Sequence, residues 1–329
     1  MKPNNSNPGR LRGKVVVVTG ASSGAGRAIA LECAREGALL VLGARREEAL
    51  SEVVAECAAQ GARALAVPTD VTDAEAVQQL AEAAVEFGGA IDVWVNNAGV
   101  LAGGPFEGTP PSIHDQVIRT NLMGYLHGAH AALYYFKQQG YGTLINNISV
   151  GGWFPVPYAA GYSASKFGLR GLSEALRGEL HAWRHIHVCD LFPAFLDTPG
   201  MQHAANYTSR VLKPAPPVYD PQKVARAAVS LAVSPKNSKT VGSVATLLRL
   251  GHLFFPGLCR RITATVIEGY LKKADLAPVT SGNLFEPLEY GTGVYGGWAL
   301  MTRPAKKKLV ATLAATLIGV GFLCLRKRL

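Results

Sequence analysis

The chain has 329 residues, of which 48% are apolar and 17% are charged, and its formal net charge is +10. This size and composition fit one large α/β domain or two small ones. The last 29 residues carry seven basic residues and no acidic one, which leaves only +3 for residues 1–300. The positive charge is therefore a local feature of the C-terminus and does not indicate a nucleic-acid-binding face.

The cysteine pattern argues against a disulfide-stapled fold and against a metal-binding protein. The five cysteines are scattered, odd in number and never arranged as Cys-x-x-Cys, at Cys33, Cys57, Cys189, Cys259 and Cys324. We therefore expect reduced thiols, without a disulfide framework and without a zinc site or other metal site. Residues 1–12 form a polar tail that lacks the apolar core of a secretory signal.

The first predicted strand, Lys14–Thr19, leads into a glycine-rich turn and then into a helix that runs through Glu36. In this arrangement glycines let the backbone approach a pyrophosphate, and the free amides of the helix face the anion. The candidate phosphate-binding residues are Gly20, Ser22, Ser23, Gly24, Ala25 and Gly26. The spacing, Gly-x-x-x-Gly-x-Gly, differs from the commoner Gly-x-Gly-x-x-Gly, and an ordinary tight turn before a helix is the alternative.

The second predicted strand, Leu39–Ala44, ends in Arg45 and Arg46. Binders of NAD have an acidic residue here that accepts a bond from the ribose 2′-hydroxyl. A guanidinium instead pairs well with a 2′-phosphate, so NADP(H) is the preferred cofactor and NAD(H) the second choice. The alternative is that both arginines only begin the next helix.

Strands and helices then alternate to about residue 241. We predict helices over 47–60, 73–88 (with Thr72 or Asp73 as its N-cap), 112–138, 158–184 and 221–234, and strands over 63–67, 91–95, 143–148, 186–192 and 240–241. This alternation predicts a Rossmann-type, doubly wound parallel sheet with right-handed crossovers and helices on both faces. The predicted domain covers residues 13–242, with its site at the carboxyl ends of the strands.

Ser149 and the pair Tyr162 and Lys166 are the candidate catalytic groups. Ser149 closes a buried strand, and Tyr162-x-x-x-Lys166 places a phenol and an ammonium on one face of a helix. A fixed cation favours the phenolate, so a neighbouring lysine is expected to lower the tyrosine pKa from about 10 toward 7, where a general acid or base works best. Alone, this spacing is also common on solvated helices.

The chain resembles the short-chain dehydrogenase/reductase family over roughly residues 12–235. The matching motifs are Thr19-Gly20-x-x-x-Gly24-x-Gly26, Asp70-Val71, Asn96-Asn97-Ala98-Gly99, Asn121, Ser149, Tyr162-x-x-x-Lys166, and Pro193 with Thr198. One departure is Pro193-Ala194, where the family commonly has Pro-Gly.

The resemblance implies a role for each matched residue. Tyr162 would be the acid-base, Ser149 would orient the substrate oxygen, and Lys166 would hold the nicotinamide ribose and lower the tyrosine pKa. Asn121 would support a water-linked proton relay. The remaining cofactor contacts would be Asp70 and Val71, Asn97, Ala98 and Gly99, and Pro193 and Thr198.

Residues 243–304 extend beyond a minimal member of this family. We predict two apolar or amphipathic helices over 244–255 and 258–272, followed by an irregular arm over 278–300 that is rich in Gly, Pro and aromatic residues. The arm is either structural cover or part of a substrate lid.

Residues 305–329 contain Leu309–Leu325, a run of 17 uncharged residues framed by Lys306-Lys307-Lys308 and Arg326-Lys327-Arg328. As a helix this run would span about 26 Å, near the short limit for a bilayer core, and its basic frames suit lipid headgroups. We predict a C-terminal membrane anchor with the catalytic domain on the cytoplasmic side. The alternative is a helix packed on the domain or lying in the interface.

Together these observations predict an NADP-dependent oxidoreductase that acts on a carbonyl or secondary alcohol. The predicted substrate is a lipophilic small molecule. One alternative is a broad reductase of small xenobiotic carbonyls. A non-catalytic NADP(H)-binding scaffold is the alternative from another class, and the complete set Asn121, Ser149, Tyr162 and Lys166 argues against it. Pairing of copies through the long helices is expected only from the resemblance.

Overall fold

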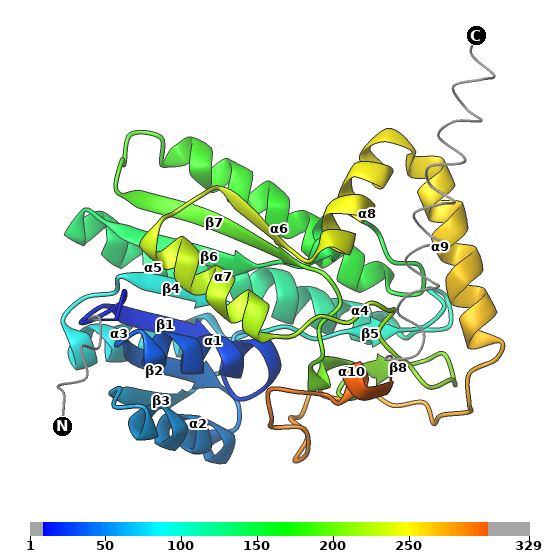
Figure 1. Cartoon of the computed structure of the whole chain (residues 1–329), viewed down its shortest axis with the longest axis horizontal. Coiled ribbons are helices and arrows are strands. Elements are labelled where there is room, and N and C mark those ends of the chain that lie inside the picture. The colour runs from blue at the N-terminus through cyan, green and yellow to red at the C-terminus, as the bar shows by residue number, and fades with distance from the viewer. Residues whose placement is uncertain (1–8, 302–329) are drawn as a thin grey trace, which may run out of the picture.

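The computed structural model describes residues 9–301. Seven parallel strands form one sheet in the order β3-β2-β1-β4-β6-β7-β9 (Figure 1). The strands are β1 (Val15–Thr19), β2 (Leu39–Ala44), β3 (Ala64–Pro68), β4 (Val93–Asn96), β6 (Gly142–Asn147), β7 (Ile186–Pro193) and β9 (Ser238–Val241). The predicted doubly wound parallel sheet is confirmed.

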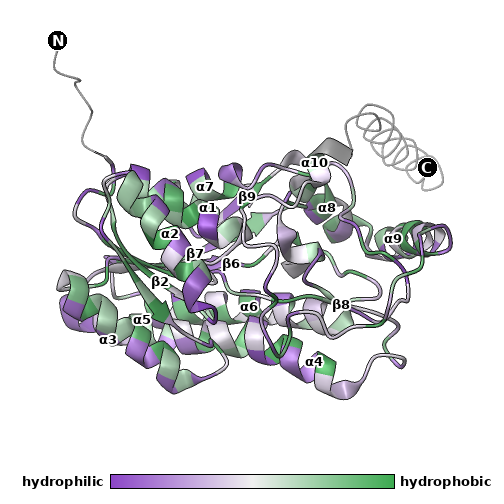
Figure 2. Cartoon of the chain, turned by 90° about the horizontal axis from the view of Figure 1, so that it is seen from below, coloured by the Kyte–Doolittle hydropathy of each residue, from purple (hydrophilic) through white to green (hydrophobic). Residues whose placement is uncertain are grey.

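Helices cover both faces of this sheet (Figure 2). One face carries α1 (Gly24–Arg35), α2 (Glu47–Ala59) and α7 (Gln222–Val233), and the other carries α3 (Ala74–Gly88), α5 (Gly124–Gln139) and α6 (Ala160–Glu179). Because both faces are covered, the central strands are buried and mostly apolar: all five residues of β1 are buried. The buried side chains on the two faces form two hydrophobic cores, which pack on either side of β1 and hold the ends of the strands in place.

Local sequence sets several helix ends as predicted. Asp73 caps α3, because its carboxylate accepts the amide hydrogen of Glu75 at 2.9 Å. The same helix ends at Gly89, which has a φ of +83°, a conformation that favours glycine. Helix α6 is shorter than the predicted 158–184 at both ends. Tyr158 has a φ of +64°, which a right-handed helix does not allow, so the helix begins two residues later.

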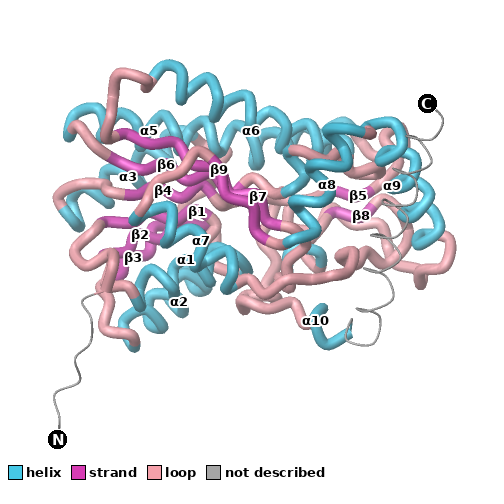
Figure 3. The backbone as a smooth tube through the Cα atoms, turned by 45° about the horizontal axis from the view of Figure 1, so that its top comes forward, coloured by secondary structure: helices cyan, strands magenta, loops and turns pink. Residues whose placement is uncertain are grey.

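Beyond the sheet, the extension forms a helical hairpin and an arm. The hairpin consists of α8 (Ser243–Phe254) and α9 (Pro256–Leu271), close to the predicted 244–255 and 258–272. It lies at the same end of the molecule as a small two-stranded sheet of β5 (Ala102–Gly103) and β8 (Ala205–Asn206), which was not predicted (Figure 3). The arm returns across the domain and ends in α10 (Trp298–Met301).

Among residues 9–301, no helix is both long and apolar enough to cross a membrane. The predicted membrane segment, 309–325, lies outside the described residues. Four cysteines, Cys33, Cys57, Cys189 and Cys259, are buried free thiols, as expected, and Cys324 lies beyond the described part of the chain.

Candidate active site

The glycine-rich turn brings the start of α1 against the end of β4. Gly20 has a φ of +65°, and a Cβ atom there would lie 2.7 Å from the Cα of Ala98. Only glycine therefore permits this approach. Ser23 is the N-cap of α1, but its side chain makes no capping bond. The first amides of a helix have no partner within the helix, so this end of α1 is suited to an anion.

Asn97 braces the ends of three strands. Its side-chain amide donates to the carbonyl oxygens of Thr19 and Gly20 at 3.0 and 3.2 Å, and its side-chain oxygen accepts a bond from Asn147 at 2.8 Å. The role of Asn97 in this structure is thus to hold the turn in place. That Asn97, Ala98 and Gly99 line the cofactor stays a prediction.

Asn121 lies in a π-helical turn, Arg119–Met123, between α4 (Pro111–Ile118) and α5. The single helix predicted over 112–138 is confirmed as continuous helical backbone, but its π-helical middle was not predicted. The buried Asn121 side chain accepts the amide hydrogen of Val100 at 2.8 Å and donates to the Val100 carbonyl at 2.9 Å and to the Ser165 hydroxyl at 3.2 Å. Such π-turns often mark functional sites.

We expect Asn121→Ala to lower the free energy of unfolding by about 2–4 kcal/mol, because the amide and carbonyl of Val100 would lose their buried partners. Chemical denaturation measures this loss. Asn237→Ala, at an exposed loop position, is the control and should change stability by less than about 0.5 kcal/mol. A loss for Asn121→Ala no larger than that of the control would contradict this bracing role.

Ser149 and Tyr162 meet at the carboxyl end of β6. Ser149 has a φ of +104°, a strained value for a residue with a side chain, and its hydroxyl accepts the amide hydrogen of Gly151 at 3.1 Å. Tyr162 lies in the first turn of α6, and a Cβ atom on Gly151 would be 2.9 Å from a carbon of its ring and 3.6 Å from the Ser149 hydroxyl oxygen. The two hydroxyls predicted to act together are therefore adjacent.

Lys166 lies directly behind this pair and is 4% exposed. Its Nζ atom is 5.7 Å from the ring centre of Tyr162 and 5.0 Å from that of Tyr125. A Cβ atom on Gly99 would be 3.8 Å from this Nζ and 3.3 Å from the side-chain oxygen of Asn121. Asn121, Tyr162 and Lys166 thus surround one point at the end of β4.

The two pKa values in this group differ from our prediction. Burial raises the pKa of Tyr162, opposed by the hydrogen bond to Ser149, and burial lowers the pKa of Lys166 to about 7. We expected the lysine charge to lower the tyrosine pKa. The correction has a physical reason: a dry site disfavours the charged form of both groups, and a lysine with a pKa near 7 is only partly charged at neutral pH.

Lys166 also provides a test of whether a nicotinamide cofactor fits. Its buried amine makes no hydrogen bond or ion pair within residues 9–301. A buried amine without a partner is costly, and ribose hydroxyls are partners of the right chemistry. At the start of α1 the Gly293 carbonyl takes the amide of Gly24, and the amides of Ala25 and Gly26 are the ones left to face a pyrophosphate, so the residues present fit the cofactor.

The remaining predicted cofactor residues lie along the same edge. Asp70 accepts the amide and hydroxyl hydrogens of Thr72 at 2.9 and 2.8 Å, and Val71 is buried beside it. Pro193 ends β7, and a Cβ atom on Gly24 would lie 3.2 Å from Thr198. The topology thus gathers the carboxyl ends of β1, β3, β4, β6 and β7 around one site.

The arm contacts the cofactor side of this site. The Arg45 guanidinium donates to the carbonyl oxygens of Asn283 at 2.6 Å and Phe285 at 2.9 Å. The amide of Gly24, the first residue of α1, donates to the Gly293 carbonyl at 3.0 Å. The arm thus covers this edge, but its Leu284 also packs in the hydrophobic cluster that Tyr162 contacts, so cover and substrate lid both stay predictions.

Arg46 differs from its neighbour. Its guanidinium makes no hydrogen bond or ion pair within the described part of the chain, and partial burial together with the charge of Arg45 lowers its pKa. Sequence reasoning could not separate the two arginines, and it missed Ser165, Tyr125 and Asn147 as supports of the site. No local motif marks these supports, because their partners are distant in sequence.

The sequence profile of the family described as short chain dehydrogenase matches residues 14–208. The chain belongs to the short-chain dehydrogenase family. As a member of this family it is an oxidoreductase acting on CH–OH or C=O groups with a nicotinamide cofactor.

Three curated proteins illustrate the range of relatives that this short-chain dehydrogenase resembles. An uncharacterised oxidoreductase of Bacillus subtilis is 34% identical over 263 residues, which cover 78% of this chain and 73% of that protein. A 3-ketodihydrosphingosine reductase of Bos taurus is 32% identical and is matched over 72% of this chain and 73% of its own length. A 3-oxoacyl-[acyl-carrier-protein] reductase of Thermotoga maritima is 33% identical, with coverages of 71% and 96%.

Solved structures agree with this assignment. An alcohol dehydrogenase from the archaeon Thermococcus sibiricus, complexed with 5-hydroxy-NADP, has a TM-score of 0.62 at 29% identity, over 70% of this chain and 97% of its own. A metagenomic short-chain oxidoreductase in complex with NADP has a TM-score of 0.61 at 31% identity, with coverages of 70% and 98%.

Proposed function

We propose that this chain is an NADP(H)-preferring reductase of a lipophilic ketone or aldehyde. The observation that carries the chemistry is the position of Tyr162 beside Ser149, with the buried amine of Lys166 behind them making no hydrogen bond or ion pair within residues 9–301. When bound, the nicotinamide supplies the hydride for reduction or accepts it in the reverse direction.

The side chains hold the substrate oxygen and move one proton. Ser149 donates a hydrogen bond to that oxygen, and Tyr162 gives it the phenolic proton as negative charge develops there. Burial raises the pKa of Tyr162, so the phenol is protonated at neutral pH and is ready as an acid. Lys166 holds the ribose hydroxyls, and Asn121 supports the route by which the proton of Tyr162 is replaced.

The preference for NADP(H) rests on the two arginines after β2. Arg45 is bonded to the arm, whereas the guanidinium of Arg46 is free for a 2′-phosphate. The two solved relatives named above, which are complexed with 5-hydroxy-NADP and with NADP, support this assignment.

We expect Arg46→Ala to raise the KM for NADPH by about 10- to 150-fold, which corresponds to the loss of about 1.5–3 kcal/mol from a charged hydrogen bond. The KM for NADH should change less than threefold. Arg63→Ala is the matched control. Arg63 precedes β3 at the opposite edge of the sheet from Arg46, and its guanidinium lies over the Phe87 ring, away from the 2′-phosphate position. An equal rise for both cofactors would contradict the assignment.

A lipophilic substrate is supported by two relatives whose names specify a 3-keto or 3-oxo group on a long-chain or acyl compound. We further propose that residues 309–325 anchor the chain in a membrane with the catalytic domain on the cytoplasmic side. Such an anchor would place the site near substrates dissolved in the bilayer. Assembly of copies through the long helices is also a proposal.

The test is the oxidation of NADPH and NADH by the detergent-solubilised full chain over a panel of carbonyls. The panel runs from short aldehydes through ring ketones to long-chain 3-keto lipids. We expect NADPH-dependent turnover that increases with substrate lipophilicity. Highest turnover on short aldehydes would instead identify a broad reductase of small carbonyls. Tight NADPH binding without turnover on any carbonyl would identify a binding scaffold.

A further inference from the structure

The hairpin of α8 and α9 presents an unusually apolar outer surface. Within these two helices only Ala245 and Cys259 are buried. The exposed apolar side chains of the hairpin are Leu247 (39%), Leu250 (47%), Leu253 (66%), Phe254 (68%), Phe255 (42%) and Val266 (59%). Contiguous apolar patches that are exposed to solvent commonly mark binding sites. We call these six residues the hairpin surface.

The spacing of these residues makes the hairpin surface one continuous feature. Leu247, Leu250 and Phe254 recur at intervals of three and four along α8, so they share one face of the helix. Leu253, Phe254 and Phe255 lie at the turn between the two helices. The hairpin stands beside the sheet rather than over it (Figure 1). Its most exposed apolar residues are therefore at a projecting tip.

The inner face of the hairpin is fixed to the active-site wall. Ala245 and Cys259 pack with Val150 and Phe154, which follow the catalytic Ser149 directly in the chain. The guanidinium of Arg249 stacks on Trp153, with its carbon 4.0 Å from the ring centre. The hairpin surface is thus held at a constant position relative to Ser149.

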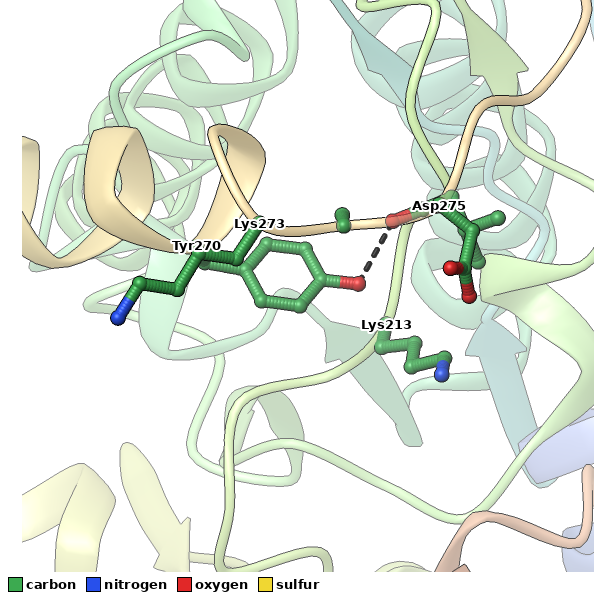
Figure 4. A pocket seen from close by; sticks show the side chains of 6 residues that line it. Lys213, Tyr270, Lys273 and Asp275 are labelled. Carbon is green, nitrogen blue, oxygen red and sulfur yellow. Dashed lines mark hydrogen bonds between the residues drawn. The ribbon is translucent and has the colours of Figure 1, made fainter.

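The base of the hairpin is fastened to the loop after β8. The Tyr270 hydroxyl donates to the Val211 carbonyl at 2.7 Å, and the Arg210 guanidinium donates to the Ala274 carbonyl at 3.0 Å. Figure 4 shows Tyr270 beside Lys213, Lys273 and Asp275 around a shallow hollow of about 160 Å³. Charged groups thus line the base, and the exposed apolar side chains gather mainly at the tip, with Val266 and Leu276 outside it.

Charge identifies the occupant of the hairpin surface. Residues 243–273 contain five basic residues, Arg249, Arg260, Arg261, Lys272 and Lys273, and a single acidic one, Glu268. Arg260 and Arg261 are exposed directly after the apolar turn. A second copy docked about a two-fold axis would bring these like charges together. An anionic lipid surface complements them, and apolar residues beside basic ones are typical of helices that lie in a membrane interface.

We propose that the tip of the hairpin, centred on Leu253, Phe254 and Phe255, inserts into the surface of an anionic lipid bilayer. The hairpin is then a membrane contact separate from residues 309–325, and it sets which way the active site faces. Because its inner face packs on the wall behind Ser149, the inserted tip holds this wall at the lipid surface. The proposal extends the proposed function by giving a lipophilic substrate a short route from the bilayer, but it does not depend on the reaction.

The test uses the full chain in vesicles of phosphatidylcholine and phosphatidylglycerol, with a tryptophan at the tip as the probe. In Phe254→Trp, we expect lipids carrying a nitroxide on the acyl chain to quench the added fluorescence at least twofold more than in Tyr134→Trp. Tyr134 is 55% exposed on α5, away from the hairpin, so it is the matched control. The unsubstituted chain gives the background of the native tryptophans.

Equal quenching at the two positions, or none at position 254, would overturn the proposal. Emission at position 254 that depends on protein concentration, without lipid quenching, would identify a second copy as the occupant and would also overturn it. Shielding of position 254 from added quencher before any lipid is present would assign the surface to residues 302–329. The readout needs neither NADPH nor substrate, so its failure is distinguishable from failure of the proposed reaction.

A variant that lacks two basic side chains tests whether charge contributes to the binding of anionic lipid. We expect Arg260→Gln with Arg261→Gln to reduce quenching at position 254 at least twofold in anionic vesicles. In vesicles of phosphatidylcholine alone, the same double substitution should change it little. Equal effects in the two lipid compositions would contradict a role for charge.

Discussion

Replacing Tyr162 by Phe should lower kcat for carbonyl reduction by about 100- to 10,000-fold, the range expected when a positioned general acid is removed. The phenylalanine ring keeps the packing of α6 but has no proton to give to the developing alkoxide. The KM for NADPH should change less than threefold, because Lys166 still provides the ribose contact. Steady-state kinetics with the best substrate of the carbonyl panel measure both quantities.

The control for this experiment is Tyr134→Phe, which removes a hydroxyl from an exposed position on α5 and should retain full activity. Ser149→Ala is a second informative variant, since the Ser149 hydroxyl lies beside the Tyr162 ring. If Tyr162→Phe kept more than a tenth of the normal kcat while remaining folded, the acid would have to be another group.

Replacing Lys166 by Met should abolish most activity and yet stabilise the fold. Burial lowers the pKa of Lys166 to about 7, whereas an unfolded lysine titrates near 10.4. Below pH 10 the unfolded chain therefore binds a proton that the folded chain resists, so the lysine opposes folding. At about 1.4 kcal/mol per pH unit, this difference sets an upper limit of about 5 kcal/mol for the gain at and below pH 7.

The pH dependence of this gain is the decisive measurement. The penalty is complete below the pKa of Lys166 in the folded chain and disappears as the pH approaches its pKa in the unfolded chain. The gain in stability from Lys166→Met should therefore be largest at pH 7 and shrink toward pH 10. Chemical denaturation at pH 7 and pH 9.5 gives both values. Lys137→Met, at an exposed position on α5, should show no such trend. A gain that is the same at both pH values would contradict the lowered lysine pKa.

The two variants separate catalysis from stability at neighbouring positions. Tyr162→Phe should alter kcat with little change in unfolding, whereas Lys166→Met should alter both, and in opposite directions. Functional residues commonly cost stability in this way, because a dry site that suits the reaction is unfavourable for an isolated charge. A ligand that supplied partners to the Lys166 amine would reduce this cost.

The order of strands and helices and most of the site could be predicted from the sequence alone. The buried run of β1, the glycine at position 20 and the Asp73 cap each express a preference of a few adjacent residues. The strict alternation of strands with helices leaves little choice of topology. Because parallel strands end at one edge, the turn at Gly20 and Ser149 could be assigned to one site, whereas Asn121 was assigned to it only through the family resemblance.

Other features were decided only by the tertiary structure, because they depend on residues distant in sequence or on burial. Arg45 differs from Arg46 through contacts with an arm some 240 positions away. The π-turn at Asn121 depends on a loop partner, Val100, whose position no helical pattern reveals. The pKa values of Tyr162 and Lys166 follow from the loss of water around them, and the spacing of the two residues carries no information about the depth of burial.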